Sequence, residues 1–536
     1  MEPALRLVTS QQLGYQLHGQ SISTLAYADD ITIISATAPG LQAQLNLLSS
    51  WAQSCGLSFN PTKCASLSVA RIPTGFTLGL TAIETADSII KDIKTIDSSL
   101  LAPWQKIDCV NTFLTPRLTF YLTLGTVPKK KLDKVDKTLR RAVKRWLHLP
   151  QRASVEVVHM PHSQGGANVA PCNIMADIAQ VSHATHLFSS RDPTVTSLAL
   201  RTLQLVTEKR IRRKPSSTDL CTYLSGSMEG EFGCDPYDIP SFWTRLRMAT
   251  RRLQKRINLV WRPGENDTPT LFVNGRPVSS AASSKAVTEA VKSTFLDSLL
   301  RKPDQGKTFK IISGNHNSNH FLSDGKYTRF ADWRFIHRAR LSVVPLRGLR
   351  RFGHASQLCR RCQKHRETLA HVINHCPPNF AQITRRHNAI LDRLVNSFDH
   401  NNLEVYVNKQ VPGYPGNCRP DLVVLNSSPK TATVIDVATP FENGADAFSR
   451  ARSEKVNKYR ELTEYLKSKG YDTFTDAFIV GALGGFDAAN ESTLQRLGVR
   501  RNYAKIMKRL MVSDCIRGSR VIYTNHLCGQ LQRQHQ

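Results

Sequence analysis

The chain of 536 residues has no apolar run long enough to cross a bilayer, which argues against a membrane-spanning helix. No secretory signal is expected at its start, because polar and apolar residues alternate over residues 1–20. Acidic residues are scarce: 42 Asp and Glu stand against 72 Lys and Arg, a formal net charge of +30. The twelve cysteines are scattered apart from one cluster, which favours a reducing compartment with free thiols and one metal site.

The basic excess is concentrated in three segments. Residues 129–145 carry nine Lys and Arg against two Asp, residues 333–366 carry ten and no acid, and residues 245–256 carry six. A field of this sign attracts polyanions, so nucleic acid is the expected partner. A basic protein of the membrane surface is the main alternative, but no strongly amphipathic helix of low complexity supports it.

Two adjacent acids, Asp29 and Asp30, stand between apolar, β-branched runs in residues 22–35. The runs predict two strands, and Tyr-Ala-Asp-Asp at 27–30 predicts the tight turn that joins them. Paired carboxylates at a rigid hairpin tip are suited to the divalent metal ions that nucleotidyl transfer needs. An acidic turn between core strands is the alternative, but the apolar flanks predict a strand pair buried on both sides.

This hairpin resembles the metal-binding palm hairpin of reverse transcriptases. The helix expected over 41–55, its stop at Gly56 and the segment ending in Lys63-Cys64 are similar to the region after that hairpin in retrotransposon polymerases. The resemblance places Lys63 near the primer terminus, although a solvated turn lysine fits the position equally well. The palm also needs a carboxylate from an earlier strand, and Glu2 is the only acid before Asp29. We therefore expect the rear portion of a polymerase, without polymerase activity of its own.

Residues 85–150 are expected to be helical and resemble the thumb of the same polymerases. The resemblance includes Pro116-Arg117-Leu118 and the final sequence Trp-Leu-His-Leu-Pro at 146–150. A thumb clamps a duplex by its backbone, so a basic helix suits it. The expected phosphate contacts are Lys129, Lys130, Arg140 and Arg141. The alternative is a charged helix face that contacts only solvent.

A cysteine and histidine cluster lies within residues 359–376. Cys359, Cys362, His371 and Cys376 have the spacing C-x2-C-x8-H-x4-C, and three Cys with one His make a closed, structural zinc shell. A short helix over 368–376 brings His371 and Cys376 to one metal if its last turn is loosened. His365 and His375 are alternative ligands, and unrelated thiols near a buried histidine are the other interpretation. Arg360 and Arg361 are expected to contact phosphate beside the metal.

The segment after this cluster predicts a helix at 380–398, strands at 403–407, 421–425 and 433–437, a helix at 446–468 and a strand at 475–480. This αβββαβ order is the core of restriction-like nucleases of the PD-(D/E)xK type, which the chain resembles. Pro420-Asp421 opens the second strand and Asp436 lies in the third, so both carboxylates can share Mg²⁺ or Mn²⁺. Acids at strand ends of an inert domain are the alternative.

The usual lysine of such nucleases is replaced by Ala438. Lys455 and Tyr459 share a helix face at i and i+4, with Lys458 as the alternative lysine. This arrangement resembles the endonuclease of site-specific non-LTR retrotransposons, in which Lys and Tyr come from that helix. The resemblance implies catalytic roles for Asp421, Asp436, Lys455 and Tyr459, and a grip on DNA by Arg386 and His387.

The expected fold class is therefore multidomain α/β. Its predicted parts are a partial reverse-transcriptase palm (1–70), a helical thumb (71–150), an α-rich basic connector (151–330), a CCHC zinc knuckle (331–378), a restriction-like endonuclease (379–490) and a helical tail (491–536).

Together these features resemble the carboxy-terminal part of a non-LTR retrotransposon polyprotein, from the subgroup with a restriction-like endonuclease that is often directed at ribosomal RNA genes. The resemblance implies nicking of target DNA and reverse transcription from the exposed 3′-hydroxyl. It also implies element RNA, genomic DNA and, with a complete palm, dNTPs as partners, Mg²⁺ and structural Zn²⁺ as cofactors, and a nuclear location. A decayed element that only binds nucleic acid is the alternative.

Overall fold

The computed structural model describes residues 2–17, 19–27, 30–59, 64, 82–124, 127–233, 239–349 and 356–529. The chain forms two compact units. The first unit comprises Met1–Thr81 and Gln180–Ser284, and the second comprises Ala82–Ala179 and Lys285–Gln536. Each unit is therefore built from two separate segments of the chain.

The first segment of the first unit contains the predicted hairpin. Its elements are α1 (Glu2–Ser10), β1 (Tyr15–Leu17), β2 (Gln20–Ile22), β3 (Thr24–Tyr27), β4 (Asp30–Ile33) and α2 (Ala38–Ser54). The strands β3 and β4 pair antiparallel, with Tyr27 opposite Asp30. A small core forms where α1 and α2 pack together with Ile33. The side chain of Leu25 is 58% exposed, so the expectation of strands buried on both sides is wrong for the described residues: helices cover one side only.

The second segment of the first unit is helical with one small sheet. It contains α9 (Pro193–Ile211), α10 (Ser217–Leu224), η5 (Gly230–Gly233), α11 (Phe242–Gln254), β5 (Leu259–Pro263), η7 (Glu265–Asp267), β6 (Pro269–Val273) and β7 (Arg276–Pro277). The sheet has the order β5-β6-β7 with antiparallel pairs. Asn274 and Gly275 join β6 to β7 with φ of 50° and 79°. Asn-Gly is the preferred pair for such a turn, so the sheet is an addition to the α-rich body that was expected here.

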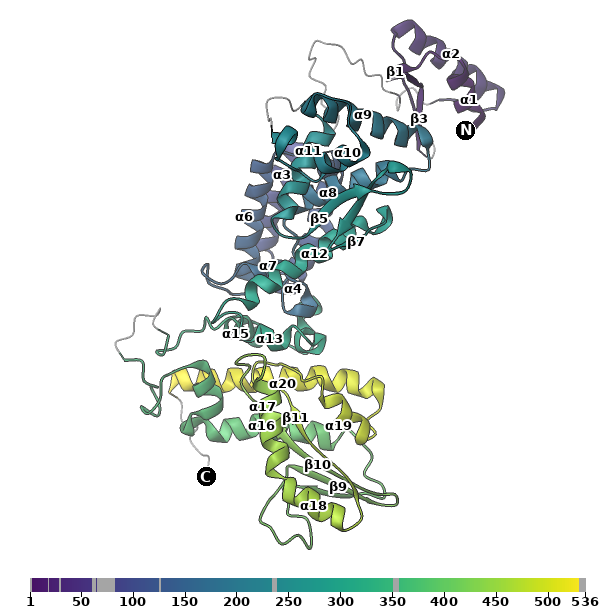
Figure 1. Ribbon diagram of the computed structural model, residues 1–536. Helices are drawn as coiled ribbons and strands as arrows, with labels where there is room; N and C mark the ends of the chain where they lie inside the picture. The colour runs from purple at the N-terminus through teal and green to yellow at the C-terminus, as the bar shows by residue number, and fades with distance from the viewer. Residues whose placement is uncertain are drawn as a thin grey trace. The chain divides into compact units, whose positions relative to one another are not determined.

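The second unit begins with the predicted thumb helices. They are α3 (Ala82–Ser98), α4 (Pro103–Cys109), η2 (Val110–Leu114), η3 (Thr115–Leu118), α5 (Thr119–Leu124), α6 (Lys129–Trp146), α7 (Glu156–His159), η4 (His162–Gln164) and α8 (Cys172–Phe188), the last of which continues into the first unit. The helical prediction over 85–150 is confirmed. The helix α6 packs against α3, because its apolar residues recur at helical spacing (Figure 1). Asp97 at the end of α3 accepts hydrogen bonds from Arg145 and Trp146, which fix the end of α6.

A second group of helices follows α12 (Ser280–Leu300), which starts in the first unit. It contains α13 (Phe309–Ile312), η8 (His316–Asn319), α14 (Phe321–Asp324) and α15 (Phe330–Arg340). The indole of Trp333 in α15 is fully buried and donates to the carbonyl of Trp146. This bond ties the second group of helices to the end of α6.

A mixed α/β layer structure completes the second unit. Its elements are η10 (His371–His375), η11 (Pro377–Asn379), α16 (Phe380–Val395), β8 (Glu404–Val407), β9 (Leu422–Ser427), β10 (Lys430–Ala438), α17 (Ala447–Lys458), α18 (Arg460–Ser468), β11 (Asp472–Ile479), α19 (Asn490–Arg496) and α20 (Arg501–Cys528). The predicted order of helix, three strands, helix and strand is found. The sheet order is β11-β10-β9-β8, parallel between β10 and β11 and antiparallel elsewhere.

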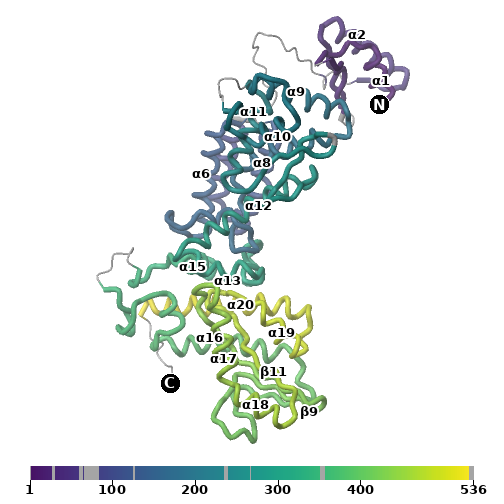
Figure 2. Tube along the Cα trace, viewed as in Figure 1, coloured from purple at the N-terminus to yellow at the C-terminus, as the bar shows by residue number. Residues whose placement is uncertain are grey.

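The central strand β10 is covered on both faces, since seven consecutive residues from Ala432 to Ala438 are buried. One face packs Ala432 and Val434 against Leu462 and Leu466 of α18. The helix α16 also contacts β10 and packs along α20 (Figure 1; Figure 2). The sheet therefore gives a rigid support for any residue at the end of β10.

The helix predicted over 446–468 is in fact two helices. It is interrupted at Tyr459, whose φ of −103° and ψ of 18° are not helical. Tyr459 is 1% exposed and belongs to the core between α18 and the sheet. The interruption lets a side chain at this position reach the end of β10 instead of following the helix surface.

Candidate functional site

Two carboxylates meet where β9 begins and β10 ends. The ladder between these strands ends at the pair Leu422 and Ile435. Asp421 and Asp436 are the next residues on each strand and so stand opposite each other. Asp436 is two residues beyond Val434 and shares its face, which is the face covered by α17 and α18. The structure therefore brings the two predicted acids together.

Asp436 is buried and held by two side chains. Its Oδ1 accepts a 2.5 Å hydrogen bond from the hydroxyl of Tyr459, and its Oδ2 lies 2.5 Å from Nζ of Lys455. Burial and the neighbouring charge of Asp436 raise the pKa of Tyr459 well above its ordinary value, so this hydroxyl remains a donor at neutral pH. Lys458 donates to the Tyr459 hydroxyl at 2.8 Å. Of the two candidate lysines, Lys455 thus reaches the carboxylate directly and Lys458 reaches it through Tyr459.

Asp421 is held from the opposite side. Its Oδ2 accepts hydrogen bonds from the backbone N–H of Val437 at 2.7 Å and from Nε2 of His387 at 3.0 Å. Burial acts to lower the pKa of His387, but the hydrogen bond and charge of Asp421 outweigh it and raise the pKa above 6.5. His387 therefore lies at the carboxylate pair, and its expected grip on DNA stays a prediction.

The donor set of this site suits a hard divalent cation. Asp436 Oδ2 is buried and accepts no well-aligned hydrogen bond from the described residues, although Lys455 Nζ is close to it. The structure records hydrogen bonds at Oδ2 of Asp421 and none at its Oδ1 within the described chain. Asp421 therefore keeps one oxygen for a ligand, whereas Asp436 Oδ2 is ion-paired with Lys455 and takes a cation only if that ammonium shifts aside. Carboxylate oxygens are what Mg²⁺ and Mn²⁺ prefer.

Arg386, the neighbour of His387, has a different role from the one expected. It is 3% exposed, and its guanidinium donates to Ser519 of α20, to Asn374 and to Thr439. A side chain this buried has no surface to offer a phosphate, so the expected DNA contact of Arg386 is wrong. Arg386 joins α16 to α20 and to the segment after β10.

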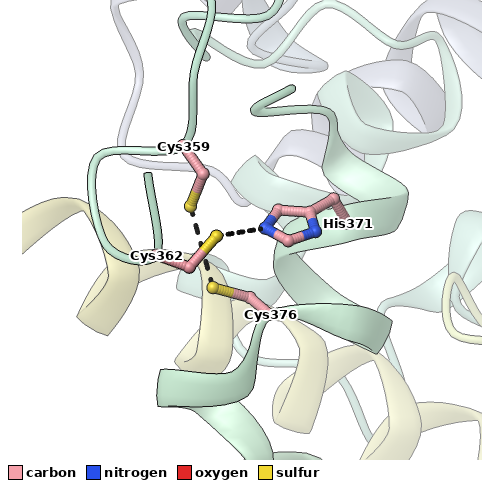
Figure 3. A group of neighbouring side chains, drawn as sticks. All are labelled: Cys359, Cys362, His371 and Cys376. Carbon is pink, nitrogen blue, oxygen red and sulfur yellow. Dashed lines mark hydrogen bonds between the residues drawn. The ribbon is translucent and has the colours of Figure 1, made fainter. Parts of the chain in front are cut away.

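The predicted metal ligands of the cysteine and histidine cluster converge. The sulfur atoms of Cys359, Cys362 and Cys376 and a ring nitrogen of His371 all lie within 4.8 Å of one another (Figure 3). Cys359 and Cys376 face each other at 3.7 Å, and Cys362 lies 3.3 Å from His371 Nε2. One cation at the centre would meet three sulfurs and one nitrogen, which is a zinc donor set.

Backbone geometry explains how this cluster forms. Residues His371–His375 are a π-helix, in which hydrogen bonds join residue i to residue i+5. His371 and Cys376 are five residues apart, so this wider turn places them on one side, as the expected loosened turn requires. His375 is exposed and His365 is absent from the converging group, which favours His371 as the nitrogen ligand.

The spacing motif did not reveal three buried residues at the cluster. His526, near the end of α20, lies 3.7 Å from Cys359 Sγ and 3.0 Å from Glu367 Oε1, and Asn379 contacts its other ring nitrogen. Burial acts to raise the pKa of Glu367, but hydrogen bonds from His526 and Arg360 hold it far below its ordinary value. His526 is 150 positions beyond Cys376, so no local pattern connects it with the motif.

The knuckle arginines that were expected to contact phosphate are engaged inside the unit. Arg360 forms two hydrogen bonds to the Glu367 carboxylate, at 2.7 and 3.0 Å. Arg361 donates to the backbone carbonyls of Asn525 and His526 at the end of α20. These partners make both guanidinium groups less available for phosphate than expected, and their phosphate contact stays a prediction.

The basic helix α6 has an inner and an outer set of cations. Lys129 is paired with Asp177 at 2.6 Å, so it is less available for phosphate than expected. Lys130, Lys134, Lys137 and Arg141 are exposed and follow one helix face at intervals of three and four residues, and Arg140 is half-buried beside them. We call Lys130, Lys134, Lys137 and Arg141 the α6 basic face. It is suited to phosphate contact, which stays a prediction.

The hairpin acids are only partly described by the structure. Asp30 is exposed at the start of β4, whereas Asp29 and Lys63 lie outside the described residues. The predicted polymerase metal site therefore rests on sequence alone. No helix among the described residues is long and apolar enough to span a membrane.

Comparisons with known proteins match this chain to reverse transcriptases and to retrotransposon polyproteins. Residues 1–91 match the family of reverse transcriptases (RNA-dependent DNA polymerases). The chain is 28% identical over 203 residues to a Pol polyprotein from a type-1 retrotransposable element R2 of Nasonia vitripennis, which covers 32% of the chain and 20% of that protein. It is 20% identical over 497 residues to the Pol polyprotein of the type-2 element R2DM of Drosophila melanogaster, covering 86% of the chain and 40% of that protein.

A further relative matches along almost its whole length. The chain is 22% identical over 536 residues to a Pol polyprotein from a type-1 element R2 of Popillia japonica, covering 93% of the chain and 96% of that protein. The chain thus spans less than half of the Nasonia and Drosophila relatives. The predicted resemblance to non-LTR retrotransposon polyproteins is confirmed.

Proposed function

This chain is a relative of the Pol polyproteins of R2 retrotransposable elements, and we propose that it joins a reverse-transcriptase region to a metal-dependent DNA endonuclease. The observation that carries the endonuclease is the pair Asp421 and Asp436 at adjacent strand ends, with Lys455 on one acid and His387 on the other. The αβββαβ order around the pair supports a restriction-like nuclease fold. The proposed partners are element RNA and genomic DNA in the nucleus.

The chemistry follows from what each side chain can do. Asp421 and Asp436 would hold Mg²⁺, which when bound supplies a nucleophile and neutralises charge on the scissile phosphate. Lys455, whose partly exposed side chain places Nζ 2.5 Å from Asp436 Oδ2, is positioned to orient water and to stabilise the negative charge that develops on phosphorus oxygens. Tyr459 fixes the carboxylate plane of Asp436 through its hydroxyl. His387 does the same for Asp421.

Nucleic-acid contact is proposed for the α6 basic face, and polymerase metal binding for Asp29 and Asp30. The cation spacing on α6 suits a phosphate backbone, and the match of residues 1–91 to reverse transcriptases supports the role of the hairpin. A copying reaction primed from a nicked strand uses both activities, and this is the reaction proposed for this chain.

The test is nicking of supercoiled DNA by the purified chain with Mg²⁺, compared with D421N and D436N. Each substitution removes a metal-binding charge, so we expect nicking to fall by about 100-fold or more. D446N is the matched control, because Asp446 is exposed at the start of α17 and pairs only with Arg450, one turn away, in the described chain. Full nicking by D421N or D436N would remove the carboxylate pair from the mechanism.

Binding without cleavage is the alternative, as in a decayed element. The α6 basic face favours it, since such a surface retains nucleic acid whether or not cleavage occurs. The same samples separate the two functions. Salt-sensitive DNA binding with no Mg²⁺-dependent nicking by the wild-type chain would select the alternative.

A further inference from the structure

The end of α20 lies against the cysteine and histidine cluster, although the two are far apart in the sequence. His526 is fully buried, with its Nε2 between Cys359 Sγ at 3.7 Å and Glu367 Oε1 at 3.0 Å. Cys359 and Glu367 are also fully buried. These three residues form a second converging group that shares Cys359 with the four predicted zinc ligands.

The hydrogen bonds of Asn379 fix the proton position on His526. The Asn379 side-chain nitrogen donates to the carbonyl of Val372 at 2.9 Å, and its other hydrogen points to His526 Nδ1 at 3.2 Å. Nδ1 therefore accepts, and in the neutral ring Nε2 carries the hydrogen. That hydrogen points toward the Glu367 carboxylate and the Cys359 sulfur. Neither ring nitrogen is left with a lone pair for a metal, so His526 is a donor to the cluster and not a fifth ligand.

Glu367 is equally unsuited to hold a second cation. Arg360 forms two hydrogen bonds to its carboxylate, and backbone N–H groups of Arg347 and Arg360 add two more. A guanidinium in this position would repel a metal ion. Glu367 instead orients the His526 ring, which is the usual arrangement behind metal-site residues.

A second link runs from the CxxC turn to the same helix end. Arg361, between Cys359 and Cys362, donates to the carbonyls of Asn525 at 2.6 Å and His526 at 3.1 Å. The last carbonyls of a helix have no partner within the helix, and a cation there satisfies them and the helix dipole. The turn that would carry two metal ligands therefore also caps α20.

The net charge of the metal-loaded site explains what these contacts would stabilise. Three thiolates and one neutral imidazole leave a Zn²⁺ site with a net charge of −1, and Cys359 has no access to water. A buried negative sulfur needs a donor. His526 Nε2–H has Glu367 Oε1 as its nearer acceptor at 3.0 Å and also faces the Cys359 sulfur at 3.7 Å, so it is shared between the two. Helix α20 thus provides a group that favours the metal-loaded state.

We propose that His526 is a positioning residue of the Cys3His site, and that metal binding and docking of the last turns of α20 are thermodynamically linked. Linkage works in both directions: bound zinc holds the helix end, and the docked helix end raises zinc affinity. The inference does not depend on nuclease or polymerase activity, because both sides of the linkage are measured without either reaction.

The first measurement is hydrogen–deuterium exchange of the zinc-loaded full chain before and after removal of zinc with a chelator. We expect amides near the end of α20 to exchange at least about tenfold faster without zinc, because their anchor is lost. Peptides from α18, which has no recorded contact with the cluster, serve as the internal control. Unchanged exchange at the end of α20 after complete zinc removal would overturn the proposal.

The second measurement is zinc affinity by competition with a chromophoric chelator. H526L fills the space without a donor, and we expect it to lower zinc affinity by about 10–100-fold, the range for residues behind a metal ligand. H526Q keeps an N–H near the position of Nε2 and should recover most of the affinity, which a purely space-filling role would not predict. H400Q alters an exposed histidine outside the cluster, whose ring contacts the nearby carbonyl of Val395, and is the control. Equal zinc affinities of H526L and the wild-type chain would overturn the proposal. If H526L does not fold, the hydrogen–deuterium exchange of the wild-type chain with and without zinc still tests the proposal.

Discussion

Replacing Tyr459 with phenylalanine isolates one hydroxyl at the carboxylate site. The ring is 1% exposed in the core between α18 and the sheet, and phenylalanine keeps that packing. The hydroxyl donates to Asp436 Oδ1 at 2.5 Å and accepts from Lys458 at 2.8 Å. Y459F leaves Lys455 as the only recorded side-chain partner of Asp436 in the described chain.

The expected cost follows from the charge of the acceptor. A hydrogen bond to a charged group contributes about 1.5–3 kcal/mol, and Asp436 is buried, so water does not readily replace the hydroxyl. We expect the free energy of opening of β10, from native-state hydrogen exchange, to fall by that amount. If the same energy orients Asp436 in the transition state, nicking falls by about 10–150-fold.

Two controls separate orientation from general weakening. Y465F removes the hydroxyl of a nearby tyrosine that donates to the carbonyl of Gly413, remote from the carboxylates. A double-mutant cycle of Y459F with D436N reports the coupling, which we expect to exceed about 1 kcal/mol for a charged hydrogen bond. Nicking and β10 exchange of Y459F both within twofold of wild type would refute this role of the hydroxyl at Asp436.

Three further results are expected. K455M should reduce nicking more than K458M, because Lys455 contacts Asp436 directly whereas Lys458 contacts Tyr459; the reverse order in single-turnover cleavage would assign the role to Lys458. Burial lowers the pKa of His337 to about 3 in the folded state. The unfolded chain binds a proton at this residue near pH 6.5, whereas the folded chain does not. The free energy of unfolding therefore keeps the full contribution of His337 above pH 6.5 and falls by about 1.4 kcal/mol per pH unit as the pH drops toward 3. H337L should flatten the melting temperature between pH 7 and 5, and an unchanged acid dependence would contradict the assignment. R361A should loosen the end of α20 while leaving the four metal ligands in place, seen as faster exchange of 520–528 with zinc still bound.

Local patterns predicted the parts of the carboxylate site that depend on the position of the strands. Pro420-Asp421 marked the start of one strand, the apolar residues Val434, Ile435 and Val437 placed Asp436 within the next, and adjacent pairing brought the two acids together. The interruption at Tyr459 was not predictable, because the residues around it continue a helical pattern. It depends on the gain from burying that ring in the core and bonding its hydroxyl to Asp436.

The spacing of the Cys and His residues also predicted which four side chains converge. It did not predict the residues that pack around them. Four ligands within 359–376 converge as expected, whereas His526 and Glu367 meet only after the whole second unit folds. The same long-range packing explains why charge counting failed for the buried Arg386 and overstated how free Arg360 and Arg361 are, since their partners lie on α20 or in the core. In the first unit, Asn274-Gly275 is a turn signal that helical periodicity alone does not reveal.

The π-helix at His371–His375 has a consequence for how the chain tolerates change. In an ordinary α-helix of 3.6 residues per turn, His371 and Cys376 would project about 140° apart. Only the wider winding lets one ion reach both side chains, so metal coordination depends directly on the π-helical backbone. Substitutions that make 372–375 wind more regularly should therefore weaken metal retention, even though none of those four residues is a ligand.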